Sequence, residues 1–271
     1  QTLLNYIRTE LKKTGTKEGC SEGGCGACTI VLGELVNNKI EYKAINSCIS
    51  FVPTLNGKQL IIVEDLVSKN GQLHPVQDAM VKFHGSQCGF CTPGFVMSLF
   101  SMFKNNKNLN NELISDSISG NLCRCTGYRP IIDAAKSLNK INKNDQFSKN
   151  KNKIIQQLKK IKPKNIYIKK DDKIYFSPKN IKDLKGIIKK HSNFSFLAGG
   201  TDLSLKVTKE RKEIPFIIDL KEINELDFIK VSKNYLEVGS ATPLIKFEKE
   251  IKKHYPDFYS VLKRYGSVQI R

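Results

Sequence analysis

The sequence predicts an α+β protein with three folded parts, and three observations support this fold class. Up to about residue 68, one amphipathic helical pattern is followed by strand-like segments. Between residues 69 and 140 the hydrophobic period becomes helical in four short segments. After a lysine-rich stretch at 141–165, helical and strand patterns alternate up to residue 271, which is typical of an α/β domain.

The first part, residues 1–68, is expected to place one helix against a small mixed sheet. Four apolar residues recur at helical spacing and share a face: Leu3, Leu4, Ile7 and Leu11. Thr2 can cap this helix and Gly15 can end it. The segments TIVLGELV and KIEYKAI then predict a β-hairpin, with Gly33 and Asn37–Asn38 near the turns. PTLNGKQLIIVEDL predicts a turn and a last strand.

The second part, residues 69–140, is expected to form a small bundle of four short helices. Pro75 opens the first helix, whose apolar side consists of Val76, Ala79, Met80 and Phe83. Pro93 opens the second, GFVMSLFSMF, which is apolar all round and is therefore expected in the core. NELISDSIS and PIIDAAKSL supply the other two helices, and the short connections favour a bundle.

The last part begins after residues 141–165, whose low complexity and many lysines predict a basic, partly helical linker that acts as a mobile tether. Residues 166–271 then predict a helix near 178–191, the strand NFSFLAG, a GGTD turn before a helix, the strands FIIDL and YLEVG, and two more helices. The chain stops at SVQIR without a cap or turn, and it starts without a methionine or an opening strand. We therefore expect a fragment at both ends.

The composition argues against several function classes. The chain has 45 Lys and Arg residues against 26 Asp and Glu, a net charge of +19. Only six of the basic residues are Arg, and no recognition motif accompanies the charge, so we expect no nucleic-acid partner. No apolar run approaches the ~20 residues of a membrane span, so we expect no membrane contact. The scattered histidines form no nucleophile–base set and are expected at the surface or as caps: His74, His84, His191 and His254.

The eight cysteines carry the functional signal. All fall before residue 126 in tight C-x-x-C and C-x-C sets, which is typical of metal ligands in a reducing compartment and predicts a cytosolic protein. The segment KEGCSEGGCGACTIVLGE contains Cys20, Cys25 and Cys28 at the C-x4-C-x2-C spacing of a plant-type [2Fe–2S] site. Cys48, further along the chain, supplies the fourth ligand of this site. Four glycines around the first three cysteines can adopt positive φ and aim N–H groups at an anionic core: Gly19, Gly23, Gly24 and Gly26. Zinc is the alternative, although its usual pattern is two separated cysteine pairs.

The second set lies in GSQCGFCTPG and GNLCRCTGYRP and consists of Cys88, Cys91, Cys123 and Cys125. Each pair is followed by Thr and then by Pro or Gly where a helix is expected, so helix N-termini would face an anionic centre. This spacing alone leaves zinc open. Beside the first set it favours a second iron–sulfur site, because the eight cysteines divide into two groups of four with none left over.

At these motifs the chain resembles the molybdenum hydroxylases, the family of xanthine dehydrogenase and aldehyde oxidase. The residues that carry the resemblance are TGTKEGCSEGGCGACT, NSC, HPVQDAMVKFHGSQCGFCTPGFVMS, SGNLCRCTGYRPIIDAA and FLAGGTDL. It implies a plant-type ferredoxin (β-grasp) domain at 1–68, a helical [2Fe–2S] domain at 69–140 and the N-terminal part of an FAD-binding domain at 166–271. It also implies a molybdenum–pterin cofactor on a partner subunit.

The flavin assignment depends on the resemblance. By itself, a strand that runs into a Gly-Gly turn and a helix can cradle a pyrophosphate, but a lone Gly-Gly turn is common and favours a plain βα connection. The resemblance assigns FAD contacts to Phe196, Leu197, Ala198, Gly199, Gly200, Thr201, Asp202 and Leu203. It also assigns a flavin contact to Tyr265. The second flavin loop of the family, Gly-Gly-Asn, would follow QIR and is absent from this sequence.

The function implied by the resemblance is electron transfer. A partner's molybdenum centre would hydroxylate xanthine or hypoxanthine, and electrons would pass through the Cys88/Cys91/Cys123/Cys125 cluster, then the Cys20/Cys25/Cys28/Cys48 cluster, to FAD and NAD. Gln87 would reach across the subunit interface to the pterin. The alternatives are the same subunit of an enzyme for an aldehyde or another N-heterocycle, a stand-alone ferredoxin-like carrier, and a zinc-bound interaction module.

Overall fold

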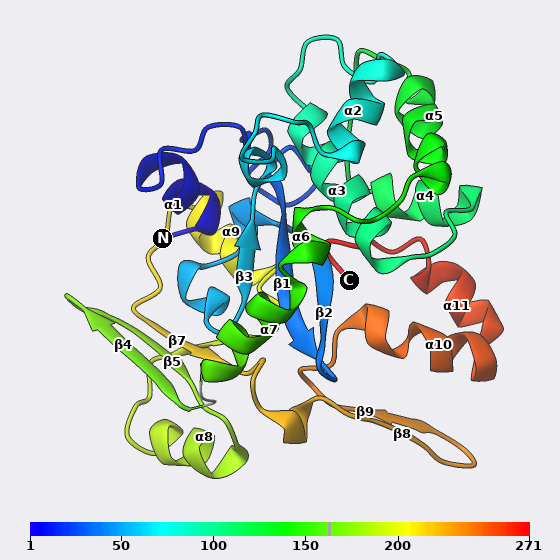
Figure 1. The fold of residues 1–271 in the computed structure, drawn as a ribbon. Coiled ribbons are helices and arrows are strands. Elements are labelled where there is room, and N and C mark those ends of the chain that lie inside the picture. Colours follow the sequence, from blue (N-terminus) through cyan, green and yellow to red (C-terminus); the bar gives the residue numbers. More distant parts are fainter. Residues whose placement is uncertain (162–163) are drawn as a thin grey trace. The chain divides into compact units, whose positions relative to one another are not determined.

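The computed structural model of the protein describes residues 1–161 and 164–271, which form two compact units (Figure 1). The first unit contains residues 1–161 and 267–270. The second contains the described residues from 164 to 266 together with Arg271. Both units combine helices with sheets, which confirms the predicted α+β class.

The first unit contains a three-stranded antiparallel sheet of order β2-β1-β3, formed by β1 (Thr29–Val36), β2 (Lys39–Asn46) and β3 (Gln59–Ile61). The predicted hairpin is confirmed, and Asn37 and Asn38 form its turn with φ of 48° and 61°. The expectation that Gly33 lies near a turn is wrong. It pairs with Tyr42 inside β1, where an added Cβ would lie 2.9 Å from the Gln59 Oε1 atom.

One sheet face packs against α1 (Leu3–Thr9), whose N-cap Thr2 accepts a hydrogen bond from the Asn5 N–H at 3.3 Å, as predicted. Helix and strands share a small core of Leu3, Ile7, Ile30, Leu32 and Ile62. The expected continuation to Gly15 is wrong: Leu11 is 40% exposed, and Lys12 has a φ of 55° that a helix does not allow.

The opposite sheet face packs against the predicted four-helix bundle, which is confirmed: α2 (Pro75–Lys82), α3 (Thr92–Asn105), α4 (Asn111–Ile118) and α5 (Arg129–Ser137). Helix α3 is buried nearly all round, as its sequence predicts. One core contains Val31 and Ile61 from the sheet and Phe95 and Phe100 from α3. Phe83 does not join the apolar side of α2, since it is 41% exposed at the C-cap.

The basic stretch after the bundle contains α6 (Gln146–Lys149) and α7 (Lys151–Lys160), which confirms its partly helical character. The expectation of a mobile tether is wrong for the part of this stretch around Phe147. Phe147 is 6% exposed and stacks edge-on against Phe100 with ring centroids 4.9 Å apart. Two residues of the expected linker, Lys162 and Pro163, lie outside the described residues.

The second unit contains a four-stranded sheet of order β4-β5-β7-β6: β4 (Ile166–Lys170), β5 (Lys173–Ser177), β7 (Phe216–Asp219) and β6 (Ser195–Leu197). Strands β5, β7 and β6 are parallel, and β4 is antiparallel to β5. The other elements are α8 (Ile181–Ile188), α9 (Leu203–Thr208), the hairpin β8 (Ile229–Val231) and β9 (Leu236–Val238), α10 (Leu244–His254) and α11 (Pro256–Leu262). Strands β4, β5 and β8 were not predicted from the sequence.

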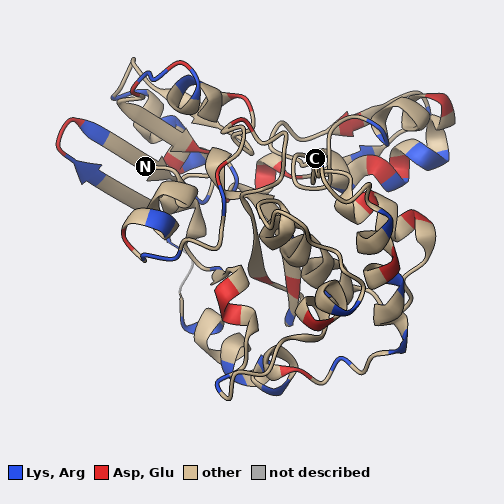
Figure 2. Ribbon diagram, turned by 90° about the horizontal axis from the view of Figure 1, so that it is seen from above, with Lys and Arg blue, Asp and Glu red and all other residues tan. Residues whose placement is uncertain are grey.

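Short 3-10 turns connect several of these elements: Ser47–Ile49, Val52–Leu55, Val63–Leu66, Leu138–Lys140 and Asn224–Leu226. Across the described ranges, every helix is too short or too polar to cross a membrane. Basic and acidic positions are interspersed along both units (Figure 2). Some are paired at the surface, such as Lys246 with Asp227 at 2.7 Å.

Candidate functional site

The first four cysteines converge in two pairs. Cys20, Cys25 and Cys28 lie in the loop between α1 and β1, and Cys48 lies in the 3-10 turn that follows β2. The Sγ atoms of Cys28 and Cys48 are 3.2 Å apart. Cys20 and Cys25 form the other pair, in which the Cys25 N–H donates to the Cys20 Sγ atom at 3.3 Å.

The glycines of this loop let the backbone approach the thiols. Gly23 and Gly26 have φ of 78° and 70°, as predicted, whereas Gly19 and Gly24 do not adopt the positive φ expected of them. A Cβ on Gly19 would lie 2.8 Å from the Cys25 Sγ atom, and a Cβ on Gly26 would lie 2.1 Å from the Gly120 oxygen. Ser21 also has a positive φ of 59°, which the sequence did not indicate.

The second four cysteines converge in the same way between helices of the bundle. Cys88 and Cys91 lie between α2 and α3, and Cys123 and Cys125 lie between α4 and α5. The Sγ atoms of Cys88 and Cys125 are 3.5 Å apart, while Cys91 contacts Cys123. Each set therefore offers two neighbouring thiol pairs.

The expectation that a helix begins directly after each pair is half correct. Cys91 is the N-cap of α3, so that helix N-terminus faces the thiols and favours a negative centre. After Cys125, by contrast, the turn Thr126–Tyr128 intervenes before α5 begins at Arg129. Tyr128 occupies the N-cap with a left-handed φ of 68°.

The protonation of the thiols follows from these contacts. The hydrogen bond with Cys28 raises the pKa of Cys48 far above its usual range. Burial, together with the contact to Cys123, raises the pKa of Cys91 to about 12. Burial opposes ionisation of Cys123, but hydrogen bonds from Thr126 lower the pKa of Cys123 to about 7. Because metal ligation needs thiolates, loading either set with metal must release protons.

The arrangement of each set as two thiol pairs fits a two-iron core. Structural zinc needs four ligands around one ion. A [2Fe–2S] core spreads its four ligands over two irons, two ligands on each, which suits thiols arranged as two pairs.

A short hydrogen-bonded bridge joins the two cysteine sets. The N–H of Leu122, the residue before Cys123, donates to the Cys25 oxygen at 2.9 Å. The buried Asn121 side chain donates to the Gly26 oxygen at 3.0 Å, which holds the bridge in place. Asn121 was not among the predicted site residues, and its position two residues before Cys123 is the one feature of the sequence that points to it.

The two sets differ in exposure. Cys28 and Cys48 are buried, whereas Cys88 and Cys125 are exposed. Gln87, which precedes Cys88, is exposed as well. The second set therefore lies at the surface of its unit, where another protein can approach it.

The predicted flavin loop connects β6 to α9 in the second unit. Gly199 and Gly200 have φ of 79° and 85°, so this turn requires glycine. Gly200 and Leu197 are buried, Thr201 and Leu203 are half-buried, and Phe196, Ala198, Gly199 and Asp202 are exposed. Tyr265 follows α11 and is 63% exposed.

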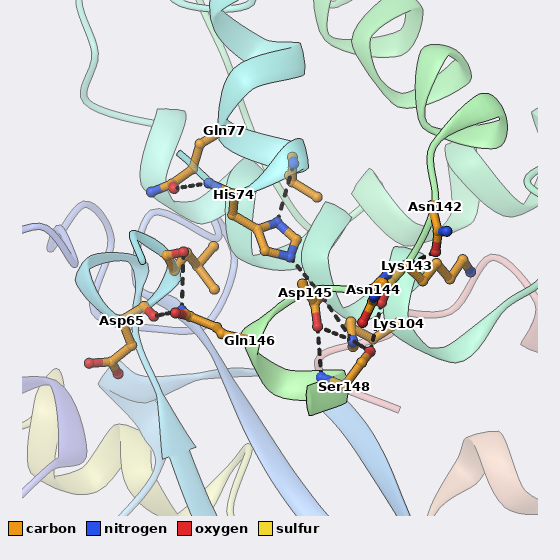
Figure 3. Close-up of polar contacts among 12 residues, drawn as sticks. Asp65, His74, Gln77, Lys104, Asn142, Lys143, Asn144, Asp145, Gln146 and Ser148 are labelled. Carbon is orange, nitrogen blue, oxygen red and sulfur yellow. Dashed lines mark hydrogen bonds and ion pairs between the residues drawn. The ribbon is translucent and has the colours of Figure 1, made fainter. Parts of the chain in front are cut away.

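His74 is the histidine whose role the sequence analysis underestimated. It caps α2 as expected, since its Nδ1 atom accepts from the Val76 N–H at 3.2 Å, but it is buried rather than at the surface. Its Nε2 atom lies 2.9 Å from Asp145, which also binds Lys104 at 2.7 Å and accepts from the Ser148 N–H (Figure 3). This network fixes the start of α6 against the bundle.

Models of three known domain families match the chain in succession. A 2Fe-2S iron–sulfur cluster binding domain matches residues 1–53, a [2Fe-2S] binding domain matches residues 62–136, and the FAD binding domain of molybdopterin dehydrogenases matches residues 168–271. The first two models contain the two cysteine sets, and the third contains the Gly-Gly turn and Tyr265.

Individual relatives agree with these models. A xanthine dehydrogenase of Blastobotrys adeninivorans is 54% identical over 50% of this chain, and an aldehyde oxidase 1 of Oryctolagus cuniculus is 47% identical over 50%. The chain spans 10% of the length of each. A solved quinoline 2-oxidoreductase from Pseudomonas putida 86 is 30% identical, covering 59% of this chain and 85% of that one, with a TM-score of 0.46. From the order of the three matching domain models and the identities with the xanthine dehydrogenase and the aldehyde oxidase 1, the chain belongs to the molybdenum hydroxylase family.

Proposed function

We propose that this chain is the electron-transfer part of a xanthine-oxidising molybdenum hydroxylase, placed between a partner's molybdenum centre and FAD, with NAD as the final acceptor. The chain contains two [2Fe–2S] binding domains and an FAD-binding domain of the family. The observation that carries the proposal is the arrangement of eight cysteines as two sets of four, each made of two thiol pairs.

Each set would hold one [2Fe–2S] cluster, which supplies one-electron storage when bound. Cys20, Cys25, Cys28 and Cys48 would hold the first cluster, and Cys88, Cys91, Cys123 and Cys125 the second. The protein supplies the ligands and N–H donors to sulfur, and it buries Cys28 and Cys48 away from water. The loop Phe196–Leu203 and Tyr265 would contact FAD through backbone N–H groups and an aromatic ring.

The residues between the two sets support transfer from one to the other. The Leu122 N–H bonded to the Cys25 oxygen links the loop that contains Cys123 directly to the loop that contains Cys25. The exposed Cys88 and Cys125 support the order in which the second set faces the molybdenum partner. The first set would follow, because Cys28 and Cys48 are buried and its other two cysteines are half-buried. A reducing, cytosolic setting suits eight free thiols.

A second candidate substrate class is an aldehyde, because an aldehyde oxidase 1 is nearly as similar to this chain as a xanthine dehydrogenase. The groups that would choose the substrate belong to the molybdenum partner. Co-expression with that partner and assay with xanthine and with a panel of aldehydes distinguishes the two candidates.

Anaerobic purification tests the electron-transfer proposal. We expect a brown protein with about four irons per chain and two distinct reduced signals in electron paramagnetic resonance. A colourless protein that contains zinc would reject it. A protein that holds clusters but binds neither flavin nor a large partner would be a stand-alone carrier instead.

A further inference from the structure

Thr126 contacts the sulfur of Cys123 through two groups. Its hydroxyl oxygen lies 3.2 Å from the Cys123 Sγ atom, and its backbone N–H donates to the same sulfur at 3.5 Å. Both contacts arise because the turn Thr126–Tyr128 folds back over Cys123 before α5 begins.

The direction of the hydroxyl hydrogen bond follows from its other neighbour. The Tyr128 N–H donates to the Thr126 hydroxyl oxygen at 3.2 Å, so this oxygen already acts as an acceptor there. A metal-bound cysteine is a thiolate and has no proton to give. The single proton of the Thr126 hydroxyl is therefore directed at the Cys123 sulfur.

The turn is held so that this donor cannot swing away freely. Tyr128 adopts a left-handed backbone with φ of 68°, which is strained for a residue with a large side chain. Its hydroxyl accepts from the Cys123 N–H at 3.0 Å, and its ring stacks edge-on against the buried Phe95 with centroids 6.1 Å apart. Both ends of the Tyr128 side chain thus anchor the turn.

We propose that Thr126 is a positioning residue that sets the reduction potential of the second cluster through the sulfur of Cys123. The inference rests on the proposed function, because it needs Cys123 as a cluster ligand. Hydrogen bonds to ligating sulfurs stabilise the more negative, reduced cluster and so raise its potential. Removal of the hydroxyl removes one of these donors and lowers the potential.

The chain offers a matched control. Thr92 also directly follows a cysteine of the second set, but its hydroxyl donates to the Ser86 hydroxyl at 2.7 Å. Thr92→Val therefore makes the same chemical change beside Cys91 while removing a bond to Ser86 instead of a bond to sulfur. Thr126→Ser keeps the hydroxyl at the test position and serves as the rescue variant.

The experiment is a redox titration of the anaerobically purified protein, followed by electron paramagnetic resonance of both clusters. Thr126→Val is expected to lower the midpoint potential of the second cluster, so that the oxidised-to-reduced ratio at a fixed potential rises several-fold. Thr126→Ser and Thr92→Val should stay near the wild-type value. The first cluster, in the same chain, serves as the internal reference and should not move.

The proposal is overturned if the second cluster keeps its midpoint potential in Thr126→Val, or if both clusters shift equally. Should that variant lack the second cluster, Thr126→Ala is titrated instead. Absence of the cluster in both variants would show that Thr126 is needed for assembly rather than for tuning, which also overturns the proposal. A wild-type protein without iron would instead reject the proposed function.

Discussion

At the scale of single residues, the division of the cysteines into two independent sites makes a sharp prediction. Cys25→Ser removes one ligand of the first set and should eliminate one of the two resonance signals, with iron falling from about four to about two per chain. The second signal should persist, because its ligands all lie between α2 and α5. Loss of both signals in a folded protein would contradict the division, and Cys88→Ser, which should give the converse pattern, is the matched control.

Asp145 should couple the stability of the first unit to pH. Burial alone would raise the pKa of its carboxyl group, but hydrogen bonds from His74 and Lys104 lower it well below the ordinary value. A pKa lowered in the folded state means that the carboxylate stabilises the fold above the unfolded-state pKa of about 3.9. This contribution to stability is lost as the pH falls through the pKa that the Asp145 carboxyl has in the folded protein.

The test is thermal unfolding of Asp145→Asn followed by circular dichroism. At pH 7 the variant leaves the buried Lys104 without its counter-ion, which should cost about 3 kcal/mol of unfolding free energy. The difference in unfolding free energy between the variant and wild type should begin to narrow near pH 4. There the Asp145 carboxyl of the unfolded wild-type chain, with a pKa of about 3.9, begins to take up protons. Asp133→Asn, which breaks the exposed pair with Arg129, should cost only about 0.5 kcal/mol. Equal effects of the two variants would remove the special role of Asp145.

At the scale of elements, α6 tests whether the lysine-rich stretch is a tether or a packed segment. Phe147 packs its buried ring edge-on against Tyr42 and Phe100, so Phe147→Ala should cost about 3–5 kcal/mol of unfolding free energy. It should also speed tryptic cleavage among the lysines of α7. Ile161→Ala, at a position that is 46% exposed, is the control within the same stretch and should have little effect. Equally fast cleavage of the wild-type protein would restore the tether interpretation.

The elements also show which features the sequence could predict. The bundle, the hairpin and both cysteine sets were predicted because each depends on local periodicity or spacing, as in the all-apolar α3. The packing of the Asp145 and Phe147 side chains was not, since Asp145 finds its partners 71 and 41 residues away in His74 and Lys104. The Asn121 contact with Gly26 spans 95 residues and was missed for the same reason. Sequence patterns report neighbours along the chain, whereas these contacts depend on how the elements pack.

At the scale of the whole molecule, the boundary of the flavin region does not coincide with the boundary of the compact units. The FAD-domain model extends to residue 271, yet residues 267–270 belong to the unit that contains the cysteines. There the Gln269 side chain donates to the Ser98 hydroxyl at 3.0 Å and to the Asn121 oxygen at 3.2 Å. Asn121 also holds the bridge between the two sets, so the last residues of the chain stabilise the same network that links the two sites.

The whole-molecule proposal of a molybdenum partner predicts a role for Gln87, which is exposed beside the exposed Cys88. Its amide offers a donor and an acceptor to a pterin edge without adding charge. Gln87→Ala should leave both clusters assembled, because among the described residues the hydrogen bonds found at the thiols do not involve this amide. It should slow the first electron transfer out of the reduced partner. Rapid mixing of the reconstituted complex with substrate, followed at the absorbance of the second cluster, measures that step directly.

The control for Gln87 is Gln157→Ala, which removes an equally exposed amide from α7, away from the cysteines in sequence. It should leave the rate of the first transfer unchanged. A slowed first step in Gln87→Ala with normal iron content and unchanged midpoint potentials would place the amide in the contact with the partner, since neither assembly nor driving force would account for the loss. An unchanged rate would leave Gln87 as a solvated neighbour of Cys88 and would require a different face of the first unit to meet the molybdenum subunit.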